Sequence, residues 1–217
     1  MAPALPIILT LKKEFQKKIA RAQDIIVEEM GKQFNQVVLH GGTAIWRCYK
    51  GNRFSEDIDV YIPKDVNKIN NFFEALKKIG FILEKKKIGE NSLYSNLKFE
   101  NIYVRFEALF KVVKGELKEY ETVEGNLITT RTLLPEELIK EKINAYLKRV
   151  KIRDLYDIFF LLRHVNEINK VKEDLKRLMK EFKNPIDEKN LKLLIISGLT
   201  PTIDEMLKYI GRMIKDG

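Results

Sequence analysis

Two aspartates in the segment RFSEDIDVYI, residues 53–62, are the side chains of this chain best suited to chemistry. Apolar residues at positions 58, 60 and 62 alternate with Asp57 and Asp59, and Pro63 ends the run, which predicts a β-strand with both carboxylates on one face. Neighbouring carboxylates repel each other unless a cation lies between them, and oxygen ligands of this type suit Mg²⁺ or Mn²⁺. The pattern therefore indicates a divalent metal site; a solvated strand edge or a salt-bridged pair is the alternative interpretation.

A pair of glycines, Gly41 and Gly42, precedes these acids. Residues 37–39 are apolar and predict a short buried strand, and Thr43 can cap a helix that continues through residues 44–49. A strand, a glycine turn and a helix start bring unpaired backbone N–H groups and the positive end of a helix dipole to one point. Such a point favours an anion, most simply a triphosphate, although glycine pairs also form plain turns.

The order of these two motifs resembles the nucleotidyltransferase superfamily that shares the DNA polymerase β palm, in which a glycine-containing helix start precedes an Asp-x-Asp strand. More narrowly, the stretch GGTAIWRCYKGNRFSEDIDVYI resembles the AbiEii/AbiGii toxin signature, in which a GGTAL motif is followed by RxSxDxD. The fourteen residues between Gly42 and Asp57 fit the narrower family. We expect the nucleotide to be bound by Gly41, Gly42, Thr43, Arg53 and Ser55.

The superfamily usually carries a third carboxylate on a neighbouring strand, and Glu107 is the best candidate for it. Residues 103–110 alternate, so that Arg105 and Glu107 share one face while the apolar residues at 104, 106 and 108 share the other. On a strand beside Asp57 and Asp59, Glu107 would ligate a metal or take the proton from the attacking group as a general base. The alternative is an ion pair between Glu107 and a lysine of an adjacent strand.

A helix is predicted from Pro135, which is followed by two glutamates and then by apolar residues at helical spacing. Lys142 and Arg149 lie seven residues apart, which places them on one side of that helix. This segment also resembles the AbiEii family, in which a lysine-bearing helix leads to an R-D-x-Y-D motif. The resemblance implies that Lys142 contacts a nucleotide phosphate and that Asp154 belongs to the active site; Arg149, Arg153 and Asp157 are further matching positions.

Asp157 has a second interpretation, because its neighbours at positions 158, 160 and 161 are apolar. A partly buried ion pair of Asp157 with Arg149 or Arg153 would stabilise the fold without taking part in chemistry. The pattern alone leaves both roles open.

The chain has 217 residues, of which 45% are apolar, so it can bury one sizeable core with a helical extension. We predict an α/β catalytic domain at 1–131, a nucleotidyltransferase palm-like mixed sheet with flanking helices, and a helical domain at 132–217 that contributes Lys, Arg and Asp to the site. Besides the segments above, helices are expected at 11–30 and around 72–79, and strands at 81–83, 92–99, 103–113, 119–123 and 127–129. From residue 135 onward, four to six helices are expected, with breaks at 184–185 and 198–201.

The net charge of +9 would attract NTP and a nucleic acid, although lysine-rich surfaces also occur for solubility alone. A single cysteine, Cys48, allows no internal disulfide and suits the reducing cytoplasm. Residues 1–9 are apolar but short and contain two prolines, so they predict neither a signal peptide nor a membrane span.

Together these patterns predict a nucleotidyltransferase that uses Mg²⁺ or Mn²⁺ to move an NMP unit from an NTP to an acceptor such as tRNA or a protein. Asp57, Asp59 and Glu107 would hold the metal. The family resemblance further implies the toxin of a toxin–antitoxin or phage-defence pair, restrained by a cognate antitoxin protein. The alternatives are a non-catalytic nucleotide- or RNA-binding module with the same fold, and a structural interaction protein.

Overall fold

The computed structural model describes residues 6–216, and these divide into two units. The first, which we call the sheet unit, takes in the ranges Met1–Lys50 and Phe54–Thr132. The second, which we call the helical unit, takes in Leu133–Gly217 together with the short segment Gly51–Arg53. The three residues Gly51–Arg53, between the glycine pair and the Asp-x-Asp strand, therefore belong to the helical unit.

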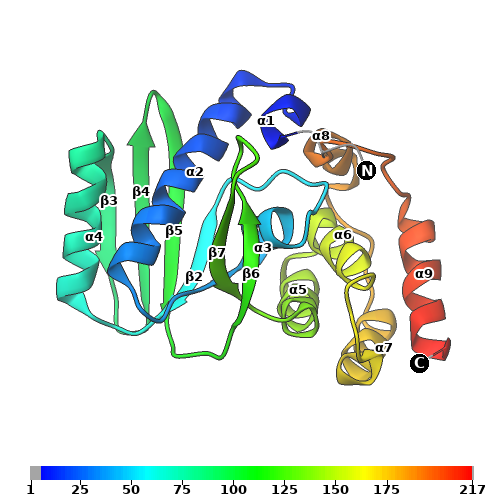
Figure 1. The fold of residues 1–217 in the computed structure, drawn as a ribbon. Coiled ribbons are helices and arrows are strands. Elements are labelled where there is room, and N and C mark those ends of the chain that lie inside the picture. Colours follow the sequence, from blue (N-terminus) through cyan, green and yellow to red (C-terminus); the bar gives the residue numbers. More distant parts are fainter. Residues whose placement is uncertain (1–5, 217) are drawn as a thin grey trace. The chain divides into compact units, whose positions relative to one another are not determined.

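The described residues of the sheet unit form a mixed seven-stranded sheet with the strand order β3-β4-β5-β2-β1-β7-β6 (Figure 1). Strand β2 runs parallel to β5 and β1 runs parallel to β7, whereas the other neighbours are antiparallel. The predicted mixed sheet with flanking helices is confirmed. In chain order the strands are β1 (Val38–His40), β2 (Ile58–Ile62), β3 (Ile82–Ile88), β4 (Ser92–Phe99), β5 (Ile102–Phe110), β6 (Glu116–Glu121) and β7 (Leu127–Thr132).

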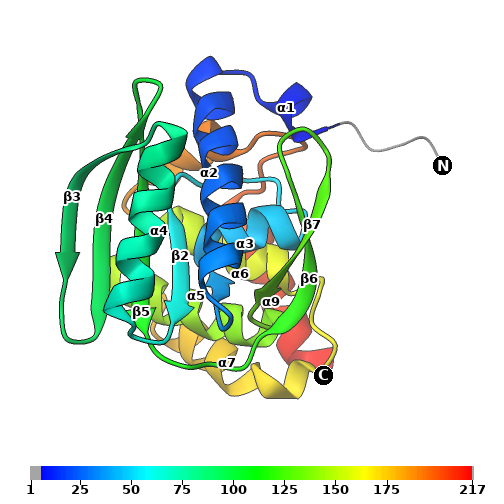
Figure 2. The same ribbon diagram turned by 60° about the vertical axis from the view of Figure 1, so that its left-hand side comes forward.

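Two helices, α2 (Glu14–Gln33) and α4 (Val66–Ile79), pack side by side over one face of this sheet (Figure 2). The ring of Phe72 on α4 lies 4.9 Å from that of Phe106 on β5, and the apolar residues of β2 are fully buried. Because side chains alternate along a strand, Asp59 and its same-face neighbours must point to the opposite face. The apolar half of the predicted alternation thus holds the sheet against its helices and turns the carboxylates away from them.

Several boundaries differ from the predicted ones for local reasons. Helix α2 begins at Glu14 rather than residue 11, because the backbone of Lys13 is extended and a short helix, α1 (Ile7–Thr10), precedes it. Strand β3 continues through the lysine-rich run to Ile88, because its ladder to β4 forms regardless of side-chain polarity. Of the N-terminal run 1–9, residues 1–5 lie outside the described residues.

The described part of the helical unit contains five α-helices, within the predicted four to six (Figure 1). The first starts at Pro135 as expected, and the N–H of Leu134 donates to Oε2 of Glu137 at 3.2 Å. It ends where Val150 takes a left-handed conformation, with φ of 52°. The helices are α5 (Pro135–Arg149), α6 (Ile152–Leu161), α7 (Lys172–Lys180), α8 (Leu191–Leu194) and α9 (Ile203–Asp216), with 3₁₀ turns η1 (Ile168–Lys170) and η2 (Glu188–Asn190).

None of the helices in residues 6–216 is long and apolar enough to cross a membrane.

Candidate active site

The central strands of the sheet unit line up three polar side chains. Asp59 on β2 is in register with Glu107 on the parallel strand β5 and with His40 on the antiparallel strand β1. Paired residues on neighbouring strands point to the same face of a sheet, so these side chains form one row across it. The ring of His40 also stacks on that of Tyr61, the next residue of β2 on that face, with centroids 4.1 Å apart.

The carboxylate of Asp59 lies directly against the backbone of Gly41. Gly41 has a φ of 71°, and a Cβ added there would overlap Oδ2 of Asp59 and come within 3.0 Å of its Cγ. Only glycine fits both this backbone conformation and this close approach. The glycine corner and the acidic strand, fourteen or more residues apart in the sequence, are therefore contiguous in space.

The helix after the glycines, α3, spans Gly41–Cys48, and its N-cap residue is His40. The prediction that Thr43 caps this helix is therefore wrong, because the helix starts two residues earlier and Thr43 lies inside it. Instead, the buried Thr43 hydroxyl donates to the backbone carbonyl of Asp57. The side-chain amide of Gln23 donates to the backbone carbonyl of the buried Ser55 at 2.9 Å. These contacts fix the loop that leads into β2.

Asp57, immediately before β2, is paired with Arg105 on β5. Arg105 Nε donates to Asp57 Oδ1 at 2.8 Å, and Nη2 donates to Oδ2 at 2.6 Å. Both side chains remain partly open to solvent, 21% for Asp57 and 45% for Arg105. Arg105 lies on the same face of β5 as Glu107, as the alternation predicted, but its pairing with Asp57 was not predicted.

The donor set for a metal is present, but it is not assembled in this structure. Among the described residues, no group of three or more His, Cys, Asp or Glu side chains is close enough to hold a metal ion. Partial burial raises the pKa of Glu107, and so does the charge of Asp59, while Arg105 offsets part of the shift. A divalent cation would relieve this repulsion, so the oxygen ligands fit such an ion once Asp57 is released.

Glu107 forms no ion pair with a lysine in residues 6–216, the alternative considered for it; its charged neighbours are Asp59, Arg105 and Asp57.

In the helical unit, Asp157 lies at the centre of a buried charge cluster. Arg53 donates to both of its carboxylate oxygens at 2.8 Å, and Lys142 Nζ lies 2.8 Å from its Oδ2. Burial by itself would raise the pKa of Asp157, but the charges of Arg53 and Lys142 outweigh it and lower that pKa. Asp157 therefore forms a buried ion pair, as one interpretation predicted. Its partners are Arg53 and Lys142, however, and not Arg149 or Arg153.

Arg149 pairs instead with the fully buried Asp154, through two contacts of 2.7 Å. Lys142 Nζ is also 3.7 Å from Oδ1 of Asp154. Lys142 and Arg149 thus lie on one side of α5, as their spacing predicted, and two carboxylates from α6 orient the lysine ammonium.

A second buried network, which the sequence analysis missed, ties α3 to the rest of the sheet unit. The guanidinium of Arg47 pairs with Asp24 on α2, and Nε of Arg47 donates to the Tyr120 hydroxyl at 3.2 Å. The N–H of Val123 and the hydroxyl of Tyr120 also donate to Asp24, at 2.7 and 2.9 Å. No local pattern marks these residues, because their partners lie 23 to 99 positions away.

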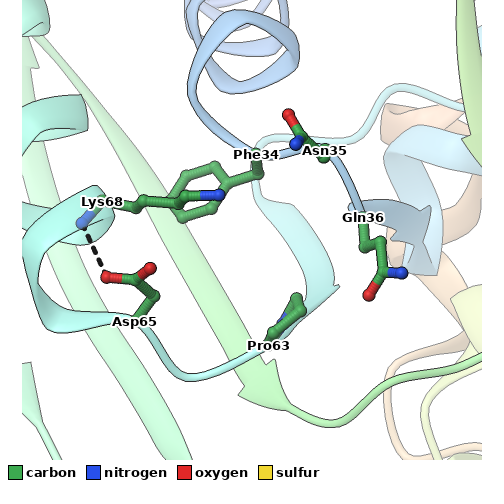
Figure 3. A pocket seen from close by; sticks show the side chains of 6 residues that line it. All are labelled: Phe34, Asn35, Gln36, Pro63, Asp65 and Lys68. Atoms are coloured by element: carbon green, nitrogen blue, oxygen red, sulfur yellow. Dashed lines mark hydrogen bonds between the residues drawn. The ribbon is translucent and has the colours of Figure 1, made fainter.

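Cations line a cavity of about 390 Å³ at the far end of β2 from Asp57. It is bordered by Lys111, Lys114 and Arg131, and by Tyr61, which shares a face of β2 with Asp59. No acidic side chain is found among its described lining residues. A neighbouring pocket of about 230 Å³ lies between the segment 34–36 and the start of α4, and it contains none of the predicted site residues (Figure 3).

A family model described as nucleotidyl transferase AbiEii toxin, type IV TA system, matches residues 26–212. This range contains the glycine corner, strands β2 and β5, and the buried charge cluster around Asp157. Among proteins with curated functions, none matches this sequence.

Solved structures with the same fold include JHP933 from Helicobacter pylori, at 22% identity and a TM-score of 0.67, with 94% of each chain covered. The nucleotidyltransferase toxin MenT4 from Mycobacterium tuberculosis superposes with a TM-score of 0.66 at 16% identity, covering 95% of this chain and 85% of that one. A putative nucleotidyltransferase from H. pylori gives 0.64 at 23% identity, with 94% and 96% covered. At these identities the similarity establishes the fold.

Proposed function

The chain belongs to the AbiEii family of nucleotidyl transferase toxins, and on that premise we propose that it transfers an NMP unit from an NTP to an RNA acceptor with the help of Mg²⁺. The family match confirms the resemblance seen in the sequence and the class of enzyme, a nucleotidyltransferase. The metal, the acceptor and the partner protein are the parts that we propose.

The observation that carries the proposal is the contact between Gly41 and the carboxylate of Asp59, with Glu107 in register beside it. Backbone N–H groups at the start of α3 would bind phosphates next to these acids. Mg²⁺, or Mn²⁺, bound by Asp57, Asp59 and Glu107 would orient the phosphates and neutralise their charge for an in-line displacement. The acceptor oxygen would bond to the α-phosphorus and the bond to the leaving pyrophosphate would break. Glu107 is the candidate acceptor of the released proton in the alternative in which Asp57 and Asp59 hold the metal without it.

Lys142 is proposed as a phosphate ligand, on the basis of the family pattern. Its ammonium is oriented by Asp154 and Asp157, which would act as positioning residues in this scheme. Arg53 was predicted to bind nucleotide, but it donates to both carboxylate oxygens of Asp157. We propose that it holds this carboxylate in place, and that the carboxylate in turn positions the Lys142 ammonium. Thr43 and Ser55 would contribute by fixing the loop ahead of Asp57.

The cationic cavity supports RNA, the class that includes the predicted tRNA, over a protein as the acceptor. Lys111, Lys114 and Arg131 carry the charge that a phosphodiester backbone requires, and Tyr61 connects the cavity to the sheet face that carries Asp59. A cognate antitoxin is proposed on family grounds alone. We place the reaction in the cytoplasm, where NTP and RNA are available.

A non-catalytic nucleotide- or RNA-binding module is the second candidate, and one observation favours it. Arg105 occupies both oxygens of Asp57, which leaves the carboxylates short of a ready three-ligand site. Binding of NTP without transfer would support this candidate.

The test is incubation of the protein with each α-labelled NTP, Mg²⁺ and either total RNA or total protein. We expect label in RNA, lost in Asp57→Asn and Asp59→Asn. Asp65→Asn is the matched control, because it makes the same substitution in the sheet unit at the cap of α4, where asparagine serves equally well. Label in protein would overturn the acceptor, and transfer that survives both active-site variants would overturn the metal assignment.

A further inference from the structure

The pairing of Arg105 with Asp57 places a positive charge directly on one of the proposed metal ligands. Two N–H groups of Arg105 occupy both carboxylate oxygens, at 2.8 and 2.6 Å, on the face of β5 that also carries Glu107. We propose that Arg105 is a positioning residue that holds Asp57 in the metal-free protein, competes with the divalent cation for it, and moves to a nucleotide phosphate when the metal binds. This inference rests on the proposed function and names the regulation of its site.

The register between β2 and β5 accounts for the contact of Arg105 with Asp57. Ile58 pairs with Phe106 and Asp59 with Glu107, so continuing the parallel register by one residue brings Asp57 opposite Arg105. The arginine therefore reaches Asp57 directly from the neighbouring strand. Asp59, two pairs further along on the same face, lies against Gly41 instead.

The pair is open enough to exchange. The Asp57 side chain is 21% exposed and that of Arg105 is 45% exposed, so a hydrated ion can approach, and parting such a pair costs less than parting a buried one. Residues 6–216 contain no ready group of three ligands, and Asp57, one of the three proposed, is held by Arg105. Release of Asp57 would make its carboxylate available together with Asp59 and Glu107.

The released guanidinium would remain on the face where phosphates are expected. Its donors form a planar fork that fits a phosphate as well as a carboxylate, so one side chain can serve either partner. Metal loading and nucleotide binding would then be coupled: the ion takes Asp57 and the phosphate takes Arg105. Each event makes the other more favourable.

The first experiment measures the affinity for Mn²⁺ alone, without nucleotide, in the wild-type protein and in Arg105→Gln. We expect the variant to bind Mn²⁺ roughly fivefold more tightly, the factor that an exposed ion pair at the upper end of the usual range contributes. Arg21→Gln is the matched control, since Arg21 is also exposed, pairs with Glu124 at 3.1 Å and carries the same charge on α2. Its Mn²⁺ affinity should change less than twofold.

The second experiment measures binding of a non-hydrolysable NTP analogue at saturating Mn²⁺. Here Arg105→Gln should bind roughly tenfold more weakly, because a charge-assisted contact to phosphate is lost, while Arg21→Gln should match the wild type. A gain in metal affinity with a loss in nucleotide affinity is a combination that a merely structural role would not produce.

An Arg105→Gln protein whose Mn²⁺ affinity equals or falls below that of Arg21→Gln would overturn this inference and leave the metal site intact. Absence of Mn²⁺ binding in every protein would remove the proposed metal function and the inference with it. An NMR titration of the wild-type protein makes the test independent of the variant's folding. The Arg105 Nε–H resonance should shift as Mg²⁺ is added, and an unmoved resonance would contradict the exchange.

Discussion

Two arginine–aspartate pairs with the same two-pronged geometry lie in the two units and differ in exposure. In the sheet unit, Arg105 and Asp57 are 45% and 21% exposed; in the helical unit, Arg53 and Asp157 are 5% and 1% exposed. Removing one partner of a buried pair leaves an uncompensated charge, whereas the members of an exposed pair can turn to water or to another ion. The same contact should therefore cost more to break in the helical unit than in the sheet unit.

Of the variants that test this difference, Arg53→Ala should lose the most stability. It removes both contacts of Arg53 from the buried Asp157 and leaves Lys142 to compensate the charge in part, so we expect a loss of about 3 kcal/mol in the free energy of unfolding, the lower end for breaking a buried pair. Urea denaturation of the full chain measures it. Arg21→Ala, which opens an exposed pair, is the control and should change stability by less than about 1 kcal/mol. Equal losses in the two variants would show that burial does not distinguish the pairs.

Gly41→Ala should have an intermediate effect on stability and a large one on binding. The residue has a φ of 71°, and strain of this kind costs about 1 to 3 kcal/mol. Because the new Cβ would also displace the Asp59 carboxylate, Mn²⁺ binding measured by calorimetry should weaken. Gly125→Ala is the matched control: its φ is 89°, and its Cβ would meet the ring of Pro6 at 3.4 Å. It should lose stability and keep the metal affinity of the wild type.

Local patterns predicted that the strands exist better than where they end, because alternation is a property of neighbouring residues whereas the ends depend on the partner strand. The bounds of β4 agree with the predicted 92–99, and the apolar alternation around Asp59 correctly gave β2 and its buried face. Which strands pair could not be read from periodicity. The register of Asp59 with Glu107 depends on a parallel pairing across 48 positions, and the family pattern, rather than the spacing, pointed to Glu107.

Ion-pair partners were the least predictable feature. Arg53 reaches Asp157 across 104 positions, because the chain passes through the helical unit at Gly51–Arg53 before returning to the sheet. From the sequence, Arg149 and Arg153 were the nearer candidates, and proximity along the chain favoured the wrong ones. Thr43 shows that a residue with high capping preference need not be a cap. It lies inside α3, because the helix already starts at Gly41.

Stability against pH should separate Asp157 from Glu107, because their pKa values shift in opposite directions. The pKa of Asp157 is lowered in the folded protein despite its burial, by Arg53 and Lys142. Its contribution to stability is therefore present above the unfolded pKa, about 3.9, and is lost as the pH falls through the folded value. Asp157→Asn should be less stable than the wild type at neutral pH, and the difference should shrink on acidification.

The pKa of Glu107 is raised in the folded protein, by burial and by Asp59. Its favourable contribution is complete below the unfolded pKa, about 4.3, and is lost as the pH rises through the folded value. Glu107→Gln should therefore be slightly more stable than the wild type at neutral pH and equal to it in acid. Thermal unfolding between pH 3 and pH 7 measures both variants, and parallel curves for Asp157→Asn and Glu107→Gln would contradict the opposite shifts.

Arg105→Ala should change the free energy of unfolding least. A small change would show that the Arg105–Asp57 pair is not needed to hold the fold. An exposed pair contributes at most about 1 kcal/mol, so urea denaturation should find the free energy of unfolding almost unchanged, and high salt should erase what difference there is. Added Mg²⁺ should then stabilise Arg105→Ala more than the wild type, since a ligand that binds the folded state more tightly raises its stability further. If Arg105→Ala instead unfolded as readily as Arg53→Ala, Arg105 would be a structural strut like its buried counterpart, and Asp57 would not be available for exchange.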